Sequence, residues 1–267
     1  MVTSILIATV VLAVAGIVVG AALVYIGNKF HVEVDERETA IREVLPGNNC
    51  GACGYAGCDA VAAAIVAGEA SAAACPVGGA AVAEKINGIM GTNAEAAARQ
   101  VAFVKCNGSC EHTEARSNYT GIKDCRAMAL SGLNHWKCGF GCLGFGSCVS
   151  VCPQNAITVK DGVAVVDAEK CVGCGLCVKE CPKGLIELIP YGQIRAVQCV
   201  NSDKGKDVKE VCDVGCIGCK LCTKQCETGA ITVENSIAKI DYSLCNDCGA
   251  CAAKCPRKTI RKGPGQD

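Results

Sequence analysis

The 267-residue sequence predicts an α+β protein that consists of an N-terminal transmembrane helix, a small helical module and two small domains in tandem. Two observations predict this architecture. The first 28 residues carry no charged side chain, and the cysteine-rich C-terminal half is written twice at an offset of 74 residues. The repeat preserves the cysteines, whereas the stretches between them keep only their general character. This indicates that the two domains are built to hold a set of thiolate ligands.

The N-terminal segment, residues 1–28, is expected to be a transmembrane anchor. Residues 4–26 are almost wholly apolar, and a helix needs about twenty apolar residues to cross a bilayer. A signal peptide is the alternative, but it would begin with a basic region and have a shorter apolar core. The uncharged start MVTSI and the long apolar run therefore favour an uncleaved, single-pass anchor in the cell membrane.

Residues 29–100 are expected to form a helical module around four cysteines spaced C-x2-C-x4-C-x16-C, which are Cys50, Cys53, Cys58 and Cys75. The glycines between the first three allow the backbone to approach a metal core. The Ala-rich stretch 59–74 predicts a helix that returns Cys75 to the loop, and an Ala-rich helical connection is expected to continue to about residue 100. The pattern predicts a metal site with four thiolates, for which zinc is the alternative to iron and sulfide.

The two tandem domains contain the clearest motifs of the chain. CVGCGLCVKECP (171–182) and CNDCGACAAKCP (245–256) have the spacing C-x2-C-x2-C-x3-C-P. In bacterial ferredoxins, three cysteines of such a run bind one [4Fe–4S] cluster and the fourth binds the other cluster of a pair. Residues 156–167 and 230–241 each predict a β-hairpin between two cysteine runs. Residues 101–199, with an upstream cysteine-rich segment, and residues 200–267 are therefore expected to be two ferredoxin-like domains, each with two [4Fe–4S] clusters.

The crossed ligation of a cluster pair predicts four ligand sets in these domains. Three sets follow from the motifs: Cys152, Cys171, Cys174 and Cys177; Cys226, Cys245, Cys248 and Cys251; and Cys216, Cys219, Cys222 and Cys255. The fourth is incomplete, because Phe145 stands where the second copy has Cys219. Since Cys138 lies only four residues before Cys142, we expect it to supply the missing thiolate. The resulting set is Cys138, Cys142, Cys148 and Cys181.

Five cysteines lie outside these sets: Cys106, Cys110, Cys125, Cys199 and Cys212. A sixth cluster bound by Cys106, Cys110 and Cys125, with Cys199 or Cys212 as the fourth ligand, is compatible with the count. The alternative is that some of them are buried free thiols. Cys106 and Cys199 each end an apolar strand, and the two strands are expected to be neighbours. The sequence thus predicts five or six [4Fe–4S] clusters.

Disulfides are a poor explanation for the 25 cysteines. A chain of this length can bury a core without them, and C-x2-C-x2-C places three cysteines too close together for simple pairing. Reduced thiolates and low-potential clusters belong in a reducing compartment, which places the iron–sulfur domains on the cytoplasmic side of the membrane.

Other classes of function find no support in the sequence. Lys+Arg and Asp+Glu both number 26, so no basic excess indicates nucleic-acid binding. The chain has no G-x-G-x-x-G unit after a strand, no P-loop and no nucleophile–base arrangement, so we expect neither a catalytic residue nor a nicotinamide or flavin site. Several clusters on one chain indicate that electrons are carried over a distance.

The sequence resembles the B subunit of the Rnf complex over nearly the whole chain. The resemblance lies in the order of its parts, which are an uncharged anchor, the segment NNCGACGYAGCDA…CPVGG, the segment CGFGCLGFGSCVSVCP and further ferredoxin runs. The resemblance implies an electron-relay subunit of a membrane-bound ferredoxin:NAD⁺ oxidoreductase that translocates Na⁺ or H⁺. Such a subunit accepts electrons from soluble ferredoxin and passes them to other subunits. The alternatives are a subunit of another membrane redox complex, such as a hydrogenase, and a non-redox structural or assembly role for the clusters.

Overall fold

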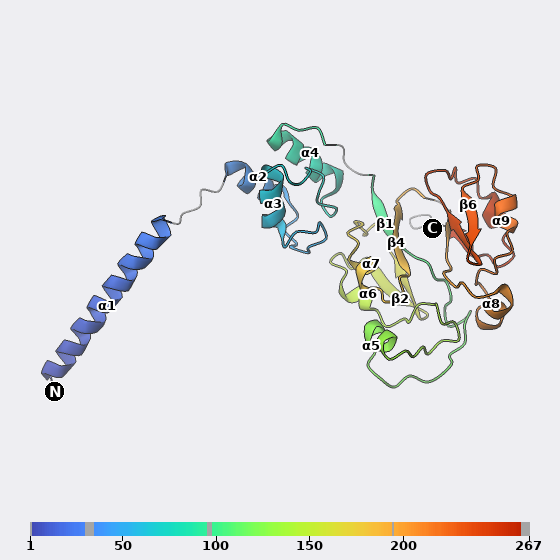
Figure 1. The fold of residues 1–267 in the computed structure, drawn as a ribbon, viewed down its shortest axis with the longest axis horizontal. Helices are drawn as coiled ribbons and strands as arrows, with labels where there is room; N and C mark the ends of the chain where they lie inside the picture. The colour runs from blue at the N-terminus through green and yellow to red at the C-terminus, as the bar shows by residue number, and fades with distance from the viewer. Residues whose placement is uncertain (1, 30–34, 95–97, 194, 263–267) are drawn as a thin grey trace.

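The computed structural model describes residues 2–29, 35–94, 98–193 and 195–262, and its elements are shown in Figure 1. In chain order the helices are α1 (Val2–Lys29), α2 (Glu36–Val44), α3 (Cys58–Val66), α4 (Gly79–Met90), α5 (Cys125–Leu130), α6 (Ser147–Ser150), α7 (Leu176–Glu180), α8 (Gly205–Val211), α9 (Leu221–Lys224) and α10 (Ala250–Ala253). The strands are β1 (Gln100–Val104), β2 (Ile157–Lys160), β3 (Val163–Val166), β4 (Ile186–Pro190), β5 (Arg195–Val197), β6 (Ile231–Glu234), β7 (Ile237–Ile240) and β8 (Ile260–Lys262). The mixture of helices and strands agrees with the expected α+β class.

The N-terminal segment is a single helix, α1, whose sequence contains no proline. Large apolar side chains are exposed along it, among them Ile17, Leu23 and Tyr25. Within the part of the chain that the structure describes, no helix is both long enough and apolar enough to cross a membrane. The expected transmembrane span is therefore not confirmed and stays a prediction.

Helices α2, α3 and α4 form the helical module around an aliphatic core that includes Ile41, Val61, Ile65 and Ile86. The helix expected over 59–74 is shorter in the structure. It ends at Val66 because Gly68, with a φ of 76°, adopts the left-handed conformation that stops a helix. The helical connection expected to reach residue 100 likewise ends at Met90. Residues 95–97 of that connection lie outside the described residues.

The C-terminal part contains two units built on the same plan, which we call the first unit (residues 98–190) and the second unit (residues 195–262). Each contains the expected hairpin, because β2 pairs with β3 and β6 pairs with β7 in antiparallel register. Each is closed by a second antiparallel pair, β1 with β4 and β5 with β8. The expectation that β1 and β5 are neighbouring strands is wrong, because each pairs with the strand that follows the last cysteine run of its own unit.

Four very short helices present cysteines in these units: α6 and α7 in the first, and α9 and α10 in the second. Each begins after a residue in the left-handed conformation, which is glycine in three cases and Lys220 in the fourth. The loop before α6 also passes close to the hairpin. A Cβ added at Gly144 would lie 2.6 Å from the carbonyl oxygen of Gly162, so only glycine fits there. At the equivalent position, Gly218, the distance to the carbonyl oxygen of Ser236 is 2.9 Å.

The structural repeat also includes residues before Cys138 and Cys212, the first cysteines that match at the offset of 74 residues. In the first unit β1 leads to Cys106, and in the second unit β5 leads to Cys199. The two copies differ in length, because 31 residues separate Cys106 from Cys138 and only 12 separate Cys199 from Cys212. The longer segment of the first unit, residues 107–137, is called the insertion below. It contains α5 and Cys125.

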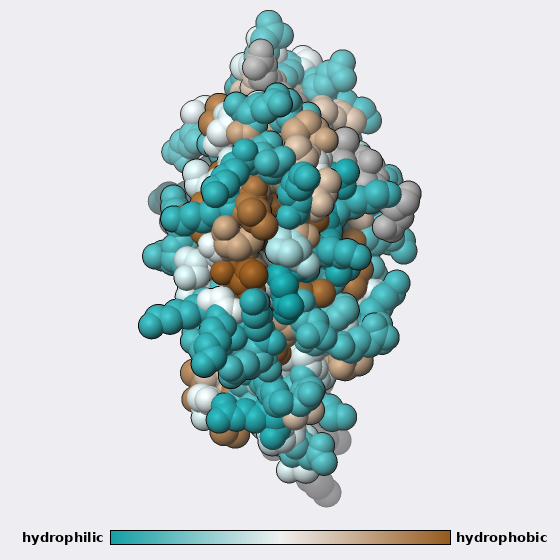
Figure 2. All heavy atoms as spheres, turned by 90° about the vertical axis from the view of Figure 1, so that its right-hand side faces the viewer, coloured by the Kyte–Doolittle hydropathy of each residue, from teal (hydrophilic) through white to brown (hydrophobic). Residues whose placement is uncertain are grey.

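Figure 2 shows the face of the molecule on the side where the second unit lies in Figure 1, and polar side chains cover most of it. The hairpin of the second unit carries an exposed ion pair between Lys239 and Glu234 at 2.9 Å. The apolar residues of this unit, including Val197, Ile231 and Ile260, are buried together with Cys222 and Cys251. The core of the unit is thus made of cysteines as well as aliphatic side chains.

Candidate metal centres

The second unit brings one expected ligand set together around a cavity. Cys216, Cys219, Cys222 and Cys255 all line this second-unit cavity, whose remaining walls include Ile217 and Ile260. The backbone N–H of Thr259 donates a hydrogen bond to Cys255 Sγ at 3.4 Å. Burial, followed by the nearby Cys216 and Cys219 thiols, raises the pKa of Cys222 to about 11. The structure therefore gathers the four thiols that the motif spacing predicted.

The first unit has an equivalent cavity, but its fourth cysteine is not the expected one. This first-unit cavity is lined by Cys125, Cys142, Cys148 and Cys181. Cys138 does not line it. Burial raises the pKa of Cys148 to about 12, and Cys142, Cys125 and Cys181 are among the neighbouring thiols that raise it further. The structure therefore does not bring Cys138 together with Cys142, Cys148 and Cys181 in this cavity, where Cys125 is the fourth cysteine.

The position of Cys125 is fixed by hydrogen bonds at the start of α5. Asp124 caps the helix, since its carboxylate accepts from the backbone N–H of Ala127 at 2.8 Å. The same carboxylate accepts from the hydroxyl of Ser147 at 2.8 Å, and that hydroxyl accepts from the backbone N–H of Cys125 at 3.0 Å. Ser147 is the first residue of α6 and lines the first-unit cavity. It thereby ties the start of α5 to the cavity.

Phe145, which stands in place of a ligand, is packed between aromatic rings of the insertion. Its ring lies 5.1 Å from that of His135 and 5.6 Å from that of Tyr119. The insertion thus supplies Cys125 to the cavity. It also supplies the aromatic side chains that surround Phe145, which stands where the second unit has a cysteine. Cys138 was the expected ligand because it is close in the chain. The Asp-Cys pair at the start of a helix was the available signal for Cys125.

The crossed set of the first unit is also brought together. Burial raises the pKa of Cys177 to about 12, and the adjacent thiols of Cys171, Cys174 and Cys152 add to the effect. Backbone N–H groups donate to two of these sulfurs, from Ala102 to Cys171 and from Ala156 to Cys152, both at 3.3 Å.

The second unit repeats this arrangement. Burial raises the pKa of Cys251, as do the nearby Cys245, Cys226 and Cys248. The side-chain amide of Gln193 donates to Cys245 Sγ at 3.7 Å.

In the helical module, Cys58 is the first residue of α3 and Asn49 accepts a hydrogen bond from its backbone N–H at 2.8 Å. Burial raises the pKa of Cys75, and the nearby Cys53 and Cys58 thiols contribute in the same direction. Cys50 lies in the same loop. Burial raises the pKa of Cys174 in the first unit, and the thiols of Cys152, Cys171 and Cys50 contribute in the same direction.

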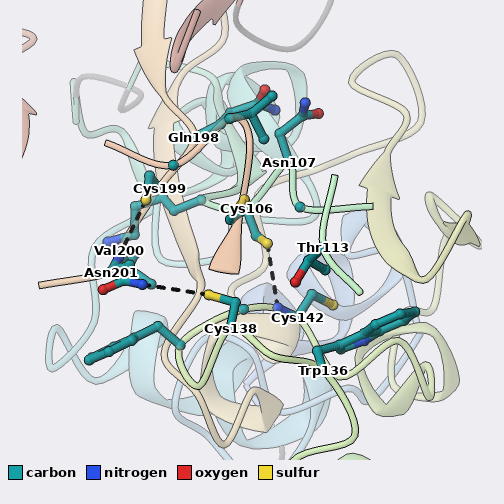
Figure 3. A pocket seen from close by; sticks show the side chains of 17 residues that line it. Cys106, Asn107, Thr113, Trp136, Cys138, Cys142, Gln198, Cys199, Val200 and Asn201 are labelled. Carbon is teal, nitrogen blue, oxygen red and sulfur yellow. Dashed lines mark hydrogen bonds between the residues drawn. The ribbon is translucent and has the colours of Figure 1, made fainter. Parts of the chain in front are cut away.

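Another cavity lies between the two units, and we call it the junction cavity (Figure 3). The cysteines that line it are Cys106, Cys138, Cys142, Cys199 and Cys212. The expected sixth set, Cys106, Cys110 and Cys125 with Cys199 or Cys212, is thus only partly brought together. Cys106 lies with both Cys199 and Cys212, Cys125 belongs to the first-unit cavity, and Cys110 is exposed on the surface.

The donor atoms suit iron–sulfur clusters. Each of the three cavities is lined by at least four cysteines and by no carboxylate. Backbone N–H groups donate to cluster-facing sulfurs, as hydrogen bonds to cluster ligands do in proteins of this chemistry. Among the described residues, no three His, Cys, Asp or Glu side chains are close enough to bind a single metal ion. The thiols surround a space, which is the arrangement that a polyatomic core needs.

Comparison with known protein families agrees with this chemistry. Residues 45–77 match the FeS family, whose description is of an Fe–S cluster. Residues 137–185 and 215–259 match the Fer4_7 family, described as a 4Fe-4S dicluster domain. Neither match includes Cys106, Cys125, Cys199 or Cys212.

Three curated relatives cover most of the chain. The chain is 45% identical over 97% of its length to the B subunit of a Na⁺-translocating ferredoxin:NAD⁺ oxidoreductase complex from Acetobacterium woodii, and covers 78% of that protein. It is 43% identical over 94% of its length to the B subunit of a proton-translocating ferredoxin:NAD⁺ oxidoreductase complex from Clostridium ljungdahlii, with 90% of that protein covered. It is 40% identical over 94% of its length to the B subunit of an ion-translocating oxidoreductase complex from Methanosarcina acetivorans, with 95% covered.

Proposed function

The chain belongs to the family of B subunits of ion-translocating oxidoreductase complexes, the Rnf type, and we propose that it relays electrons within such a complex through a series of [4Fe–4S] clusters. It accepts electrons from reduced ferredoxin and passes them to partner subunits, where NAD⁺ is reduced and Na⁺ or H⁺ is translocated. Within this proposal, no residue of the chain is needed as a catalytic acid, base or nucleophile. Its part in the oxidoreductase is to hold and connect the redox centres.

The observation that carries this proposal is the lining of the first-unit and second-unit cavities by four cysteines each. We assign five clusters, each of which exchanges one electron when bound. Their ligands are Cys50, Cys53, Cys58 and Cys75; Cys152, Cys171, Cys174 and Cys177; Cys125, Cys142, Cys148 and Cys181; Cys216, Cys219, Cys222 and Cys255; and Cys226, Cys245, Cys248 and Cys251.

The contacts between sets support an ordered relay. The module and the first unit meet at a hollow lined by Cys75 on one side and Cys171 on the other. Cys174 of the first unit also lies near Cys50 of the module. Within each unit the two sets are linked by the crossed cysteines of the ferredoxin runs. Electrons can therefore pass from one set to the next without a mobile carrier.

The polypeptide tunes the clusters by hydrogen bonds to their sulfur ligands. Such bonds stabilise the more negative, reduced form and raise the potential. In the first unit the N–H groups of Ala102 and Leu185 donate to Cys171 and Cys181 at 3.3 and 3.5 Å. In the second unit Thr259 has this role toward Cys255, and Gln193, which precedes that unit in the chain, has it toward Cys245.

Membrane attachment is the further part of the proposal. The uncharged residues 1–28 would anchor the chain by a single pass, with the iron–sulfur units on the cytoplasmic side, where thiols remain reduced. Deleting these residues should leave a protein whose clusters are still reducible but which transfers electrons poorly to the remaining complex. Electron transfer is measured with membranes that contain the other subunits. Undiminished transfer by the shortened protein would show that the anchor is not needed for assembly.

Iron and sulfide analysis of the anaerobically purified protein tests the cluster assignment. Five [4Fe–4S] clusters correspond to about 20 iron atoms per chain and six to about 24. EPR during stepwise reduction should show the clusters being reduced at potentials typical of ferredoxins. Stoichiometric zinc, or clusters that ferredoxin cannot reduce, would contradict the relay.

A further inference from the structure

One loop of the second unit carries a carboxylate where the other three cysteine runs carry glycine. The residue before the second cysteine position is Gly144, Gly173 or Gly218 in those runs and Asp247 in the fourth. All four residues have a positive φ, which is 56° at Asp247. Aspartate adopts this conformation more readily than most residues with a side chain. The exchange therefore keeps the shape of the loop and adds one negative charge to it.

The Asp247 carboxylate lies beside the sulfur of a proposed ligand. Its Oδ1 is 3.8 Å from Cys245 Sγ and accepts from the side-chain amide of Gln193 at 2.6 Å. The same amide, on a residue that is only 5% exposed, donates to Cys245 Sγ at 3.7 Å. The guanidinium of Arg195 lies near Gly249 of the same loop. Among the described residues, however, Asp247 forms no ion pair that would neutralise its charge.

The equivalent site of the first unit has a hydrogen bond to sulfur in place of this charge. There, the backbone N–H of Ala102 in β1 donates to Cys171 Sγ at 3.3 Å. Arg195 has the equivalent place in β5, because each of the two residues lies four positions before the cysteine that follows its strand. Its backbone N–H donates to Asp247 Oδ1 at 3.2 Å. The carboxylate therefore takes the N–H group that a sulfur accepts in the first unit.

The two units differ here in the space beside the loop. A Cβ added at Gly173 would lie 2.5 Å from the carbonyl oxygen of Gln100, so the first unit has no room for a side chain at this position. Gln193 is the counterpart of Gln100, six residues before the corresponding cysteine. Gln100 is exposed, whereas Gln193 is buried and holds the carboxylate. The second unit is thus adapted to the charged residue.

We propose that Asp247 lowers the reduction potential of its cluster below that of the equivalent cluster of the first unit. The inference rests on the proposed relay function. A nearby negative charge opposes the addition of an electron, and an N–H group diverted from sulfur no longer stabilises the reduced form. When an electron passes from the second unit to the first, one cluster is oxidised and the other reduced, with no bond made or broken. Asp247 makes this direction downhill. The two ligand sets are Cys226, Cys245, Cys248 and Cys251 in the second unit and Cys152, Cys171, Cys174 and Cys177 in the first.

Redox titration of the full-length protein, followed by EPR, tests the role of Asp247. Cys248→Ser identifies the second-unit signal by its loss, and Cys174→Ser identifies the equivalent first-unit signal. In the wild-type protein the second-unit signal should have the more negative midpoint potential. Asp247→Asn should keep its iron and raise only that potential, by at least about 59 mV, which is tenfold in a one-electron equilibrium. The matched control is Asp207→Asn, which removes an exposed charge from α8 and should change neither potential.

Gln193→Leu separates an electrostatic role of this group from a structural one. It removes the amide that donates to both the sulfur and the carboxylate, so the second-unit potential should fall, whereas Asp247→Asn raises it. A purely structural role would shift both variants in the same direction. Gln193→Leu also decides the question if Asp247→Asn loses iron.

The proposal would be overturned by an Asp247→Asn potential that does not rise, by a Gln193→Leu potential that does not fall, or by an equal shift in Asp207→Asn. A wild-type second-unit signal that is not the more negative of the two would also overturn it. Chemical mediators set these potentials, so the result does not depend on ferredoxin. Failure of the relay itself is distinct, because reduced ferredoxin would then reduce none of the wild-type clusters.

Discussion

At the scale of single residues, one position of the repeat lacks its cysteine, and a cysteine from a different part of the chain lines the cavity there. Phe145 occupies the position that Cys219 holds in the second unit, and Cys125 faces the cavity in its stead. The two changes belong together, because the insertion that carries Cys125 also packs the Phe145 ring against His135. The proposed ligand set thus still has four cysteines, although one of them comes from a different part of the sequence than in the second unit.

Cys125→Ser should cost the first-unit cluster, with a loss of about four iron atoms or conversion to a three-iron form. Phe145→Cys added to this variant should restore the cluster, because it places a thiol at the spacing used by the second unit. Iron analysis and EPR measure both effects. The same second change should not rescue Cys138→Ser, whose cysteine lines a different cavity. Rescue of Cys138→Ser but not of Cys125→Ser would return Cys138 to the first-unit set.

Local spacing predicted which cysteines line the second-unit cavity, but it did not predict cavities whose cysteines come from distant segments. The hairpins and the second-unit set followed from motifs that span a few residues. The partners of Cys106 could not be found in this way, because Cys199 and Cys212 reach it only after both units have folded. Cys138 lines the junction cavity although it is near Cys142 in the chain, because nearness in sequence does not determine which cavity a side chain faces.

At the scale of elements, the loops before the short helices determine where the cysteines point. These helices span only four or five residues, which is too short for stability on their own. They are held by tight contact with the neighbouring hairpin. Gly144 is the clearest example, because its left-handed φ of 74° and its approach to the carbonyl oxygen of Gly162 both exclude a side chain.

Gly144→Ala should destabilise the first unit by about 2–4 kcal/mol, since it combines backbone strain with a steric clash. Gly184→Ala is the matched control. Gly184 also has a positive φ, 60°, but no atom lies within 4 Å of its added Cβ, so only about 1 kcal/mol is expected. Thermal unfolding under anaerobic conditions measures the difference. Equal destabilisation by the two variants would show that the contact with the hairpin turn is unimportant.

At the scale of the whole molecule, the two units and the helical module differ in what stabilises them. The cores of the units include Cys106, Cys148, Cys171 and Cys222 among their buried residues. The module buries a mainly aliphatic cluster around Ile41 and Ile86. Metal ligands supply folding free energy when they are part of a core, so the units depend on their clusters more than the module does.

Removal of iron by a chelator, or exposure to oxygen, should therefore unfold the units before the module. Hydrogen exchange read by mass spectrometry should show early loss of protection in β6 and β7 and later loss in α4. The protein before chelation is the reference for each segment. Simultaneous loss in all three elements, or earlier loss in α4, would contradict this division.

The inter-unit position of the junction cysteines has a consequence for folding kinetics. The ligands of a ferredoxin run close loops of a few residues, whereas Cys106 and Cys212 are 106 residues apart in the chain. Loop closure over such a separation costs more entropy, and contacts of this kind form late. The junction cavity, whose walls come from both units, is therefore expected to form only after each unit has folded. A chain in which one unit has not folded would lack the cysteine-lined cavity that joins it to the other unit.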